Sequence, residues 1–567
     1  MSPKSSNISK QVMWNRLISV VEEQAQALVR TAFSTSVREA GDLSAGIYNS
    51  QGEMLAQAVT GTPGHVNAMA DSVAHFIKHI GKENFCDGDV YLTNDPWMGT
   101  GHLHDITVVT PNFKNSKFIG FFACTAHIVD IGGRGFGADA NSIYEEGLYI
   151  PIMKFIDKGK VNKTLIQIIK ANVREPDQLT GDLFALAACN EIGQRRLLDM
   201  MQEFKINNLK SISNFILEKS YRATVEKISK LPKESALGLM TIDGYDSPIT
   251  IQIKVTIYDK KIVCDFTGTS PVDKKGINVP LVYTKAYTCF ALKCAVAPNI
   301  PNNAASLLPF ETYAPDNSIV NAVHPAPVAL RHVIGHFIPD TIFNALNKIL
   351  PNSVPAEGAG TLCNFQVSTY PEKNTPLALD KLRAEVLTFN SGGSGARPTS
   401  DGLNATAFPS GVMTMPVEAT ENTGPIIIWR KELRPDSGGV GEFRGGLGQF
   451  MEVGVAVGHE FDFQAMFDRV DHQARGLKGG GPGAPTLISQ DDGTKMKGKG
   501  KQFVPSGRKV MLAFPGGGGF GNALKRNKSS VRKDLLLGYV SKKSAKINYG
   551  LSDADINETL REKKTFK

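Results

Sequence analysis

Glycine-rich runs in the last third of the chain constrain its fold more than any other sequence feature. They occupy residues 392–395, 438–441, 445–448 and 516–519. Glycine adopts positive φ without strain and lets backbones approach closely, whereas it weakens the interior of helices and strands. We therefore predict that this part of the chain consists of strands joined by glycine turns. The runs show no constant period, which argues against a repeat architecture.

The length of the chain predicts several domains or subdomains, because 567 residues exceed the size at which one hydrophobic core keeps growing. The hydrophobic fraction of 41% and the charged fraction of 21% are typical of globular proteins. We expect a mixed α/β (α+β) fold with several subdomains. The expected modules are a helical, mixed-sheet N-terminal module (1–231), a middle α/β module (232–389), a glycine-rich β module (390–522) and a basic helical tail (523–567).

Charge and cysteine content narrow the expected surroundings of the protein. The net charge of +8 comes from 63 basic and 55 acidic residues, with much of the excess at 494–509 and after Lys525. No nucleic-acid-reading motif accompanies these basic runs, so we expect no nucleic-acid partner. The seven cysteines form no C-x-x-C pair, which indicates a reducing compartment. With a polar start and no stretch of ~20 apolar residues, the chain is expected to be cytoplasmic and to span no membrane.

Hydrophobic periodicity predicts helices where apolar residues recur at helical spacing and strands where they alternate or run together. The helices are expected at 12–36, 68–80, 179–189, 192–218, 284–295 and 336–349, with a break at 190–193. The strands are expected at 44–48, 54–58, 89–92, 106–109, 118–126 and between 249 and 267, the first two as a hairpin around 49–52.

Two H-x-x-D elements are the sharpest chemical signal in the sequence. His102 and Asp105 form the first element and His127 and Asp130 the second, each where an apolar strand meets a glycine-containing loop. Six of the eleven histidines lie between His65 and His127. Imidazole nitrogens combined with carboxylate oxygens suit zinc, iron or manganese, and a site with few protein ligands leaves positions open for water or substrate.

The spacing alone leaves a structural alternative open, in which these histidines only satisfy hydrogen bonds at strand ends. A single H-x-x-D element would favour that alternative, and the presence of a second brings the two interpretations level. Glu39 and Asp42 follow the first predicted helix. By composition they are either further members of a ligand shell or ordinary helix-end and turn residues.

The remaining candidate motifs are interpreted as structural. Gly516, Gly518 and Gly521 form a lone G-x-G-x-x-G outside any βαβ unit, and the chain has no G-x-x-x-x-G-K-[ST] phosphate loop. If ATP takes part, we expect another chain to bind it. Cys124, close in sequence to His127, is interpreted as a buried strand thiol. The absence of G-x-S-x-G disfavours a serine hydrolase of that type.

With these residues in view, the chain resembles the hydantoinase B/oxoprolinase family over nearly its whole length. The segments that carry the resemblance are R-E-A-G-D-L-S (38–44), N-D-P (94–96), G-H-L-H-D-I-T (101–107), A-H-I-V-D-I-G-G (126–133), D-F-T-G (265–268), E-L-R-P-D-S-G-G (432–439), R-G-G-L-G (444–448) and P-G-G-G-G-F-G (515–521). They stand in the order that the family has them.

The resemblance implies a division of labour between two subunits. A hydantoinase A-type partner uses ATP to phosphorylate the carbonyl oxygen of a cyclic amide, and a subunit like this one completes the hydrolysis in a hetero-oligomer. Implied metal ligands are His102, Asp105 and His127, with one carboxylate of the 39–42 segment as the next ligand.

For that further carboxylate, Asp42 is preferred as the ligand and Glu39 as a catalytic neighbour. By the same resemblance, His104 or Asp130 orients a ligand imidazole or moves a proton. The implied cofactor is one divalent transition metal, either zinc, iron or manganese. Many relatives carry a second histidine directly after the one that matches His127, where this chain has Ile128. The substrate within the family therefore stays open.

Two other functions compete with hydrolysis of a hydantoin, 5-oxoproline or a similar lactam. One is a subunit of an ATP-dependent acetone- or acetophenone-type carboxylase, which could use the same ligand set but would depend on bicarbonate. The compact length of the chain favours hydrolysis over this alternative. The other is a noncatalytic scaffold for the ATPase partner, with His102 and His127 as structural histidines and no stoichiometric metal.

Overall fold

The computed structural model describes residues 3–59, 61–360, 362–372 and 384–565. By compactness the chain divides into two units, one formed by Met1–Gly238 with Ile251–Ile342 and the other by Leu239–Thr250 with Phe343–Lys567. Helices combine with antiparallel and mixed sheets, which confirms the expected α+β class. The division into four modules stays a prediction.

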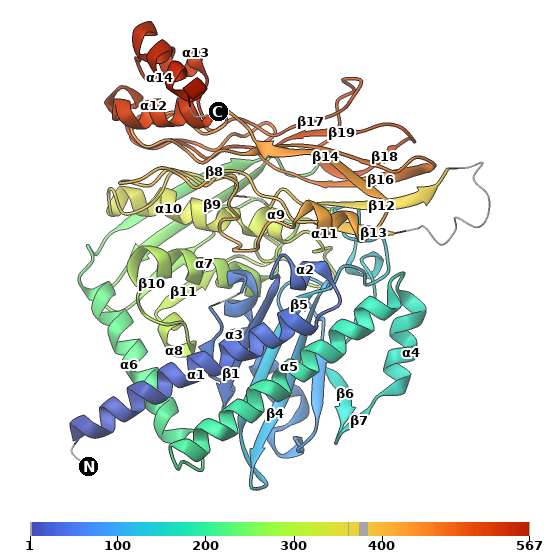
Figure 1. Cartoon of the computed structure of the whole chain (residues 1–567). Helices are drawn as coiled ribbons and strands as arrows, with labels where there is room; N and C mark the ends of the chain where they lie inside the picture. Colours follow the sequence, from blue (N-terminus) through green and yellow to red (C-terminus); the bar gives the residue numbers. More distant parts are fainter. Residues whose placement is uncertain (1–2, 60, 361, 373–383, 566–567) are drawn as a thin grey trace. The chain divides into compact units, whose positions relative to one another are not determined.

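The first part of the chain carries the elements that position the candidate site (Figure 1). In chain order they are α1 (Pro3–Thr31), α2 (Thr35–Arg38), β1 (Leu43–Asn49), β2 (Met54–Gln57), α3 (Pro63–Ile80), η1 (Lys82–Asn84), β3 (Val90–Thr93), β4 (Asp105–Lys114), β5 (Lys117–His127), η2 (Ile143–Glu145), β6 (Met153–Asp157), β7 (Lys160–Val161), α4 (Lys163–Asn172), α5 (Pro176–Glu203), α6 (Lys210–Ser229) and β8 (Ser235–Ile242).

The elements that follow include the strands of the C-terminal part. In chain order they are β9 (Ile249–Ile257), β10 (Ile262–Asp265), α7 (Leu281–Val296), α8 (Ala304–Leu307), β11 (Phe310–Tyr313), α9 (His332–Gly335), α10 (Phe337–Ile349), β12 (Phe365–Pro371), β13 (Glu385–Thr388), α11 (Val417–Glu421), β14 (Ile426–Leu433), β15 (Gln449–Val455), β16 (His459–Met466), β17 (Leu487–Gln490), β18 (Lys499–Val504), β19 (Val510–Ala513), η4 (Ala523–Lys525), α12 (Lys528–Leu537), α13 (Lys542–Ile547) and α14 (Asp553–Thr565).

A seven-stranded sheet forms the centre of the first unit, in the order β2-β1-β5-β4-β3-β6-β7 with antiparallel pairing throughout. Every residue of β1 is buried, so both faces of this strand are covered. Helices α1 and α5 run side by side and contact strands of this sheet (Figure 1). Helix α1 buries Leu17, Val21, Ala25 and Leu28, a spacing that keeps one helix face on the core.

The predicted helix break at 190–193 is wrong, because α5 continues through this segment and α6 begins only at Lys210. The Nδ2 group of Asn190 donates to the carbonyl oxygen of Val108 and to Thr110 Oγ1, at 3.3 and 3.1 Å. A Cβ on Gly193 would lie 2.8 Å from the ring of Phe122. These residues therefore fit the helix onto the sheet, and their helix-breaking tendency is outweighed by packing.

Two antiparallel four-stranded sheets form the main β part of the second unit. Their orders are β13-β12-β16-β18 and β14-β15-β19-β17. Phe365 and Phe463 from the first sheet share one hydrophobic core with Val453 and Leu512 from the second. The apolar faces of the sheets therefore pack together, which confirms that strands dominate the glycine-rich region.

The glycine-rich runs themselves are not turns, contrary to the sequence-based prediction. None of their glycines has a positive φ. Instead, the runs pack backbone against backbone: the N–H of Gly517 donates to the carbonyl oxygen of Gly446 at 3.0 Å and its own carbonyl accepts from Gly439 at 2.8 Å. A Cβ on Gly393 would lie 1.9 Å from the carbonyl oxygen of Gly446. Glycine is required here because the neighbouring backbone fills the space of a side chain. We call residues 392–395, 438–441, 445–448 and 516–519 the glycine layer.

Within the described residues, no helix combines the length and the apolar character that crossing a membrane requires. The long helices α1 and α5 both carry polar and charged positions along their length, and each buries only part of its surface. Their apolar residues are used to cover the central sheet.

Candidate metal centre

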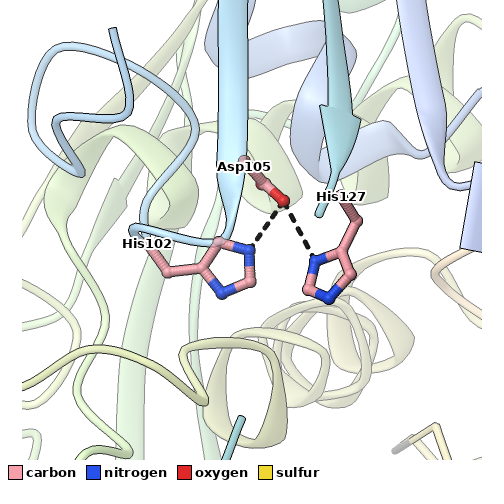
Figure 2. A group of neighbouring side chains, drawn as sticks. All are labelled: His102, Asp105 and His127. Atoms are coloured by element: carbon pink, nitrogen blue, oxygen red, sulfur yellow. Dashed lines mark hydrogen bonds and ion pairs between the residues drawn. The ribbon is translucent and has the colours of Figure 1, made fainter. Parts of the chain in front are cut away.

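The candidate centre forms where β4 and β5 meet. Asp105 begins β4 and His127 ends β5, and the antiparallel register places them directly opposite each other. Such a pair shares one face of the sheet, with Cβ atoms about 4.5–5.5 Å apart. His102 stands in the turn before β4, where its carbonyl oxygen accepts from the N–H of Asp105 at 3.4 Å. The β4–β5 hairpin thus brings together residues from both H-x-x-D elements (Figure 2).

His102, Asp105 and His127 direct one potential ligand atom each at a common point. Asp105 Oδ1 lies 2.7 Å from His102 Nε2 and 3.2 Å from His127 Nδ1 (Figure 2). The three ligand atoms all lie within 4.8 Å of one another, and the three side chains are buried. Zinc bonds to nitrogen and carboxylate oxygen of about 2.0–2.2 Å are compatible with these separations.

The hydrogen bonds of His102 explain why a cation fits this point. Its Nδ1 lies 2.8 Å from the carbonyl oxygen of Ala329, which can only accept, so Nδ1 carries the proton. Burial and the nearby Arg331 guanidinium hold the pKa of His102 well below its usual range, so the ring is neutral. The Nε2 lone pair therefore faces the carboxylate oxygen of Asp105 at 2.7 Å. A bound cation would turn this repulsion between lone pairs into attraction.

The second carboxylate oxygen of Asp105 has a separate set of partners. Asp105 Oδ2 accepts from Thr100 Oγ1 at 2.7 Å and from Arg331 at 2.5 Å, and it lies 2.9 Å from His65 Nε2. Burial alone would raise the pKa of Asp105, but Arg331 and the neighbouring imidazoles hold it well below its usual range. Asp105 is therefore ionised in its buried surroundings.

Asp42 is connected through His65 to the triad of His102, Asp105 and His127. Asp42 Oδ1 accepts from Thr62 Oγ1 at 3.1 Å and lies 3.6 Å from His65 Nδ1, while the opposite nitrogen of His65 faces Asp105. Burial opposes a charge on His65, but Asp105 and Asp42 outweigh it and raise the pKa of His65 above its usual value. The structure thus places Asp42 next to the triad without bringing its carboxylate into the group of three converging ligand atoms.

His104 lies beside the triad with one ring nitrogen available. Its Nδ1 donates to the carbonyl oxygen of Ile128 at 3.0 Å, and its Nε2 is buried without a hydrogen-bond partner among the described residues. Its ring stacks on that of His127, with centroids 5.5 Å apart. Burial and the proximity of His127 lower the pKa of His104 to about 3. His104 is therefore neutral, with a lone pair on Nε2.

Glu39 and Asp130 make contacts away from the triad. Glu39 carries a partly exposed side chain 3.7 Å from Arg38. Asp130 accepts from the backbone N–H groups of Gly132 and Glu175 at 2.9 and 3.0 Å, and from the guanidinium of Arg174 at 2.8 Å. Asp130 thereby anchors the loop that follows β5. It contributes to the site by holding this loop in place.

The structure adds residues that the sequence analysis did not select. His65, Arg331, His332 and His336 are all buried, and the rings of His102, His104, His127 and His332 surround Phe136 at centroid distances of 4.7–5.8 Å. The clustering of histidines before residue 128 could have drawn attention to His65. Nothing in the spacing of the sequence connects the 331–336 segment with β4, because the fold alone brings the two together.

Glu146 supports the centre from a distance. Its Oε1 accepts from the backbone N–H groups of Val328 and Ala329 at 2.6 and 2.8 Å, and the carbonyl oxygen of Ala329 is the partner of His102 Nδ1. Its Oε2 is buried without a partner among the described residues. Burial raises the pKa of Glu146 to about 8, although the two N–H groups act in the opposite direction.

This environment predicts a pH-dependent stability. The folded state holds the proton of Glu146 more tightly than the unfolded state. The protonated side chain therefore contributes to the free energy of unfolding below pH ~4.5, and this contribution is lost as the pH rises toward about 8. Glu146→Gln keeps an acceptor and removes the charge, so the free energy of unfolding should fall less steeply between pH 5 and about 8 than in the wild type. Denaturant unfolding at several pH values measures this slope. The exposed control Glu191→Gln should retain the wild-type slope, and an unchanged slope in Glu146→Gln would contradict the prediction.

Together these features define an α+β protein with a candidate centre of two histidines and one aspartate at the end of an antiparallel hairpin. The family model described as Hydantoinase B/oxoprolinase matches residues 6–523. The chain therefore belongs to the hydantoinase B/oxoprolinase family, which confirms the resemblance inferred from the sequence motifs.

Relatives place the chain among enzymes and enzyme subunits. It is 29% identical to 5-oxoprolinase 1 of Arabidopsis thaliana, over 90% of this chain and 41% of that longer protein. It is 24% identical to caprolactamase subunit beta of Pseudomonas jessenii, with 96% of each chain covered. The crystal structure of ATP-dependent caprolactamase from the same organism gives a TM-score of 0.83 at 23% identity, covering 98% of this chain and 99% of that one.

A nucleotide-free structure of acetone carboxylase shares the fold as well. It gives a TM-score of 0.83 at 18% sequence identity, and the match covers 98% of this chain and 84% of that chain. The family thus includes ATP-dependent enzymes that cleave amides, and its fold also occurs in a carboxylase.

Proposed function

We propose that this chain is the metal-dependent subunit of an ATP-dependent cyclic amidohydrolase, with a hydantoin, 5-oxoproline or a related lactam as substrate. The observation that carries the proposal is the convergence of His102 Nε2 and His127 Nδ1 on Asp105 Oδ1 in a buried site. Relatives named 5-oxoprolinase and caprolactamase support a cyclic amide as the substrate class.

The proposed cofactor is one divalent transition metal, either zinc, iron or manganese, held by His102, Asp105 and His127. The neutral ring of His102 and the ionised carboxylate of Asp105 are the forms in which these groups act as ligands. When bound, such a metal lowers the pKa of water and polarises a carbonyl oxygen. Asp42 stays a predicted fourth ligand, and the imidazole of His65 lies between its carboxylate and that of Asp105.

We propose that His104 accepts a hydrogen bond from a reactant as a neutral imidazole, because a pKa of about 3 disfavours its taking up a proton. The lone pair on its Nε2 is directed away from the Ile128 carbonyl and has no hydrogen bond among the described residues, so it is available to a reactant. The contacts of Asp130 support a positioning role, in which it fixes the loop after His127. A catalytic part for Glu39 stays a prediction, and its partly exposed carboxylate would have to act from the edge of the site.

The proposed partner is a hydantoinase A-type ATP-binding subunit. An amide is a poor electrophile, and phosphorylation of its oxygen by ATP provides a better leaving group. The chain has no G-x-x-x-x-G-K-[ST] loop, so we assign ATP binding to the partner. The name caprolactamase subunit beta supports a hetero-oligomer. The seven cysteines are free thiols, which supports a cytoplasmic location for the complex.

The metal content of the purified chain is the first test. We expect about one equivalent of zinc, iron or manganese in the wild type and loss of that metal in His127→Ala, because the variant removes one of the three ligands. His79→Ala, which removes an exposed histidine of α3, should keep the metal. Elemental analysis of the three proteins provides the measurement. Absence of metal from the wild type would remove the proposed chemistry and favour the scaffold alternative.

Activity with the partner subunit tests the substrate class. The reconstituted complex should release ADP in the presence of ATP and one of hydantoin, 5-oxoproline or caprolactam, and it should open the ring of that compound. Because the fold is shared with acetone carboxylase, acetone with bicarbonate is the comparison substrate. Turnover that depends on bicarbonate and gives a β-keto acid would replace the hydrolase by the carboxylase alternative.

A further inference from the structure

The two carboxylate oxygens of Asp105 have different surroundings. Oδ1 faces the ligand nitrogens of His102 and His127. Oδ2 faces Thr100 Oγ1, His65 Nε2 and the guanidinium of Arg331. These three polar neighbours together leave Oδ2 no open side for a cation. Only Oδ1 is left to bind a cation.

Arg331 is held rigidly on Oδ2. It is 3% exposed, and its Nε donates to the carbonyl oxygen of Thr100 at 2.7 Å while its terminal nitrogen contacts Asp105. The guanidinium carbon lies 4.1 Å from the ring centroid of Tyr283. A Cβ at position 101 would come within 2.5 Å of Arg331 Cδ, and Gly101 has a φ of +106°. The absence of a side chain at Gly101 therefore leaves the space that Arg331 occupies beside the turn before β4.

A permanent cation is an unexpected neighbour for a metal site, because like charges weaken cation binding. Neutralising the charge of Asp105 therefore does not fully explain why an arginine lies beside this site. Its planar fork joins the Thr100 carbonyl and the Asp105 carboxylate at once, which fixes the rotation of the carboxylate. Fixing this rotation determines how many oxygens Asp105 can offer.

We infer that Arg331 is a positioning residue that makes Asp105 a single-oxygen metal ligand and thereby favours small transition-metal ions over larger cations. This inference rests on the proposed metal site. Zinc accepts single carboxylate oxygens at about 2.0–2.2 Å in sites with few ligands. Calcium takes 6–8 oxygens at longer distances and often binds both oxygens of a carboxylate. With Oδ2 occupied by Arg331, Thr100 and His65, that second mode is closed.

Replacing the arginine by lysine separates positioning from charge. Arg331→Lys keeps the positive charge but cannot bridge two acceptors in one plane. We expect Arg331→Lys and Arg331→Met to lose about 10–100-fold in zinc affinity, and their preference for zinc over calcium should fall. Thr100→Val removes a second donor to Oδ2, leaves the arginine in place and should give a smaller effect in the same direction. Arg196→Met, which removes a surface partner of Glu23, should behave as the wild type.

Spectroscopy of the full-length protein reconstituted with Co2+ provides a readout independent of activity. The visible absorption of Co2+ weakens as its coordination number rises, so Arg331→Lys should show a weaker band than the wild type when both proteins are saturated. Circular dichroism verifies that each variant is folded. If Arg331→Met does not fold, the lysine and valine variants still decide the outcome.

The outcomes separate this inference from the proposed function. A wild-type protein that binds neither zinc nor Co2+ overturns the proposed metal site and the inference with it. A wild type that binds both, with a Co2+ band and a zinc preference that Arg331→Lys leaves unchanged, overturns only the positioning role and leaves Arg331 as a charge partner of Asp105.

Discussion

Asp105→Asn is expected to abolish metal binding and to lower the free energy of unfolding by about 3–5 kcal/mol. The variant replaces the anionic ligand oxygen by a neutral amide, and it leaves the buried guanidinium of Arg331 without its carboxylate. Breaking a buried ion pair from one side is costly because the remaining charge stays desolvated. The loss of activity should be as large as that of His127→Ala, since both changes remove a ligand of the same centre.

Asp182→Asn is the matched control for this prediction. Asp182 is also a buried aspartate of the first unit, but its Oδ1 accepts from the backbone N–H groups of Phe33 and Ser34 at 2.7 and 3.1 Å. An amide oxygen can still accept from both groups, so we expect a change of less than about 1 kcal/mol and full metal content. Chemical denaturation and elemental analysis measure both variants. Equal stability losses in the two variants would argue against a special role for the Asp105–Arg331 pair.

Gly393→Ala is expected to destabilise the second unit by about 4 kcal/mol or more, or to prevent its folding. The added Cβ would lie 1.9 Å from the carbonyl oxygen of Gly446 and 2.9 Å from the N of Gly517, so it collides with backbone atoms that no side-chain rotation can move. Separating these segments would also break hydrogen bonds between the runs, such as that from the Gly446 N–H to the Ser394 carbonyl at 2.8 Å.

Gly358→Ala is the control within the same region. Its Cβ would lie 3.4 Å from the N of Gly395, which is ordinary van der Waals contact, and φ at this position is not positive. We expect a change within about 1 kcal/mol. Urea unfolding, followed by circular dichroism, compares the two variants with the wild type. Similar stability of Gly393→Ala and the wild type would show that the backbone packing of the glycine layer is looser than the structure indicates.

Local sequence patterns predicted several helices and strands of the first unit. Apolar patterns placed the hairpin β1–β2 and strand β5 within a few residues of their bounds, whereas α1 begins at Pro3 instead of residue 12 and β4 continues to Lys114 instead of ending at residue 109. These features depend on neighbours along the chain, which a sequence pattern contains. The pattern failed at 190–193, where Asn190 and Gly193 predicted a helix break. In the structure both residues contact the sheet, and Asn190 also accepts a hydrogen bond from Gln24 on α1.

The two H-x-x-D elements and the family resemblance also singled out His102, Asp105 and His127 from the sequence, and in the structure the β4–β5 hairpin brings these three residues together. Only the tertiary structure decided that Asp42 joins them through His65, that Arg331 holds the second oxygen of Asp105, and that the glycine runs pack backbone to backbone instead of turning. These contacts join segments far apart in the chain. Their partners are selected by the packing of the whole unit, which no local spacing encodes.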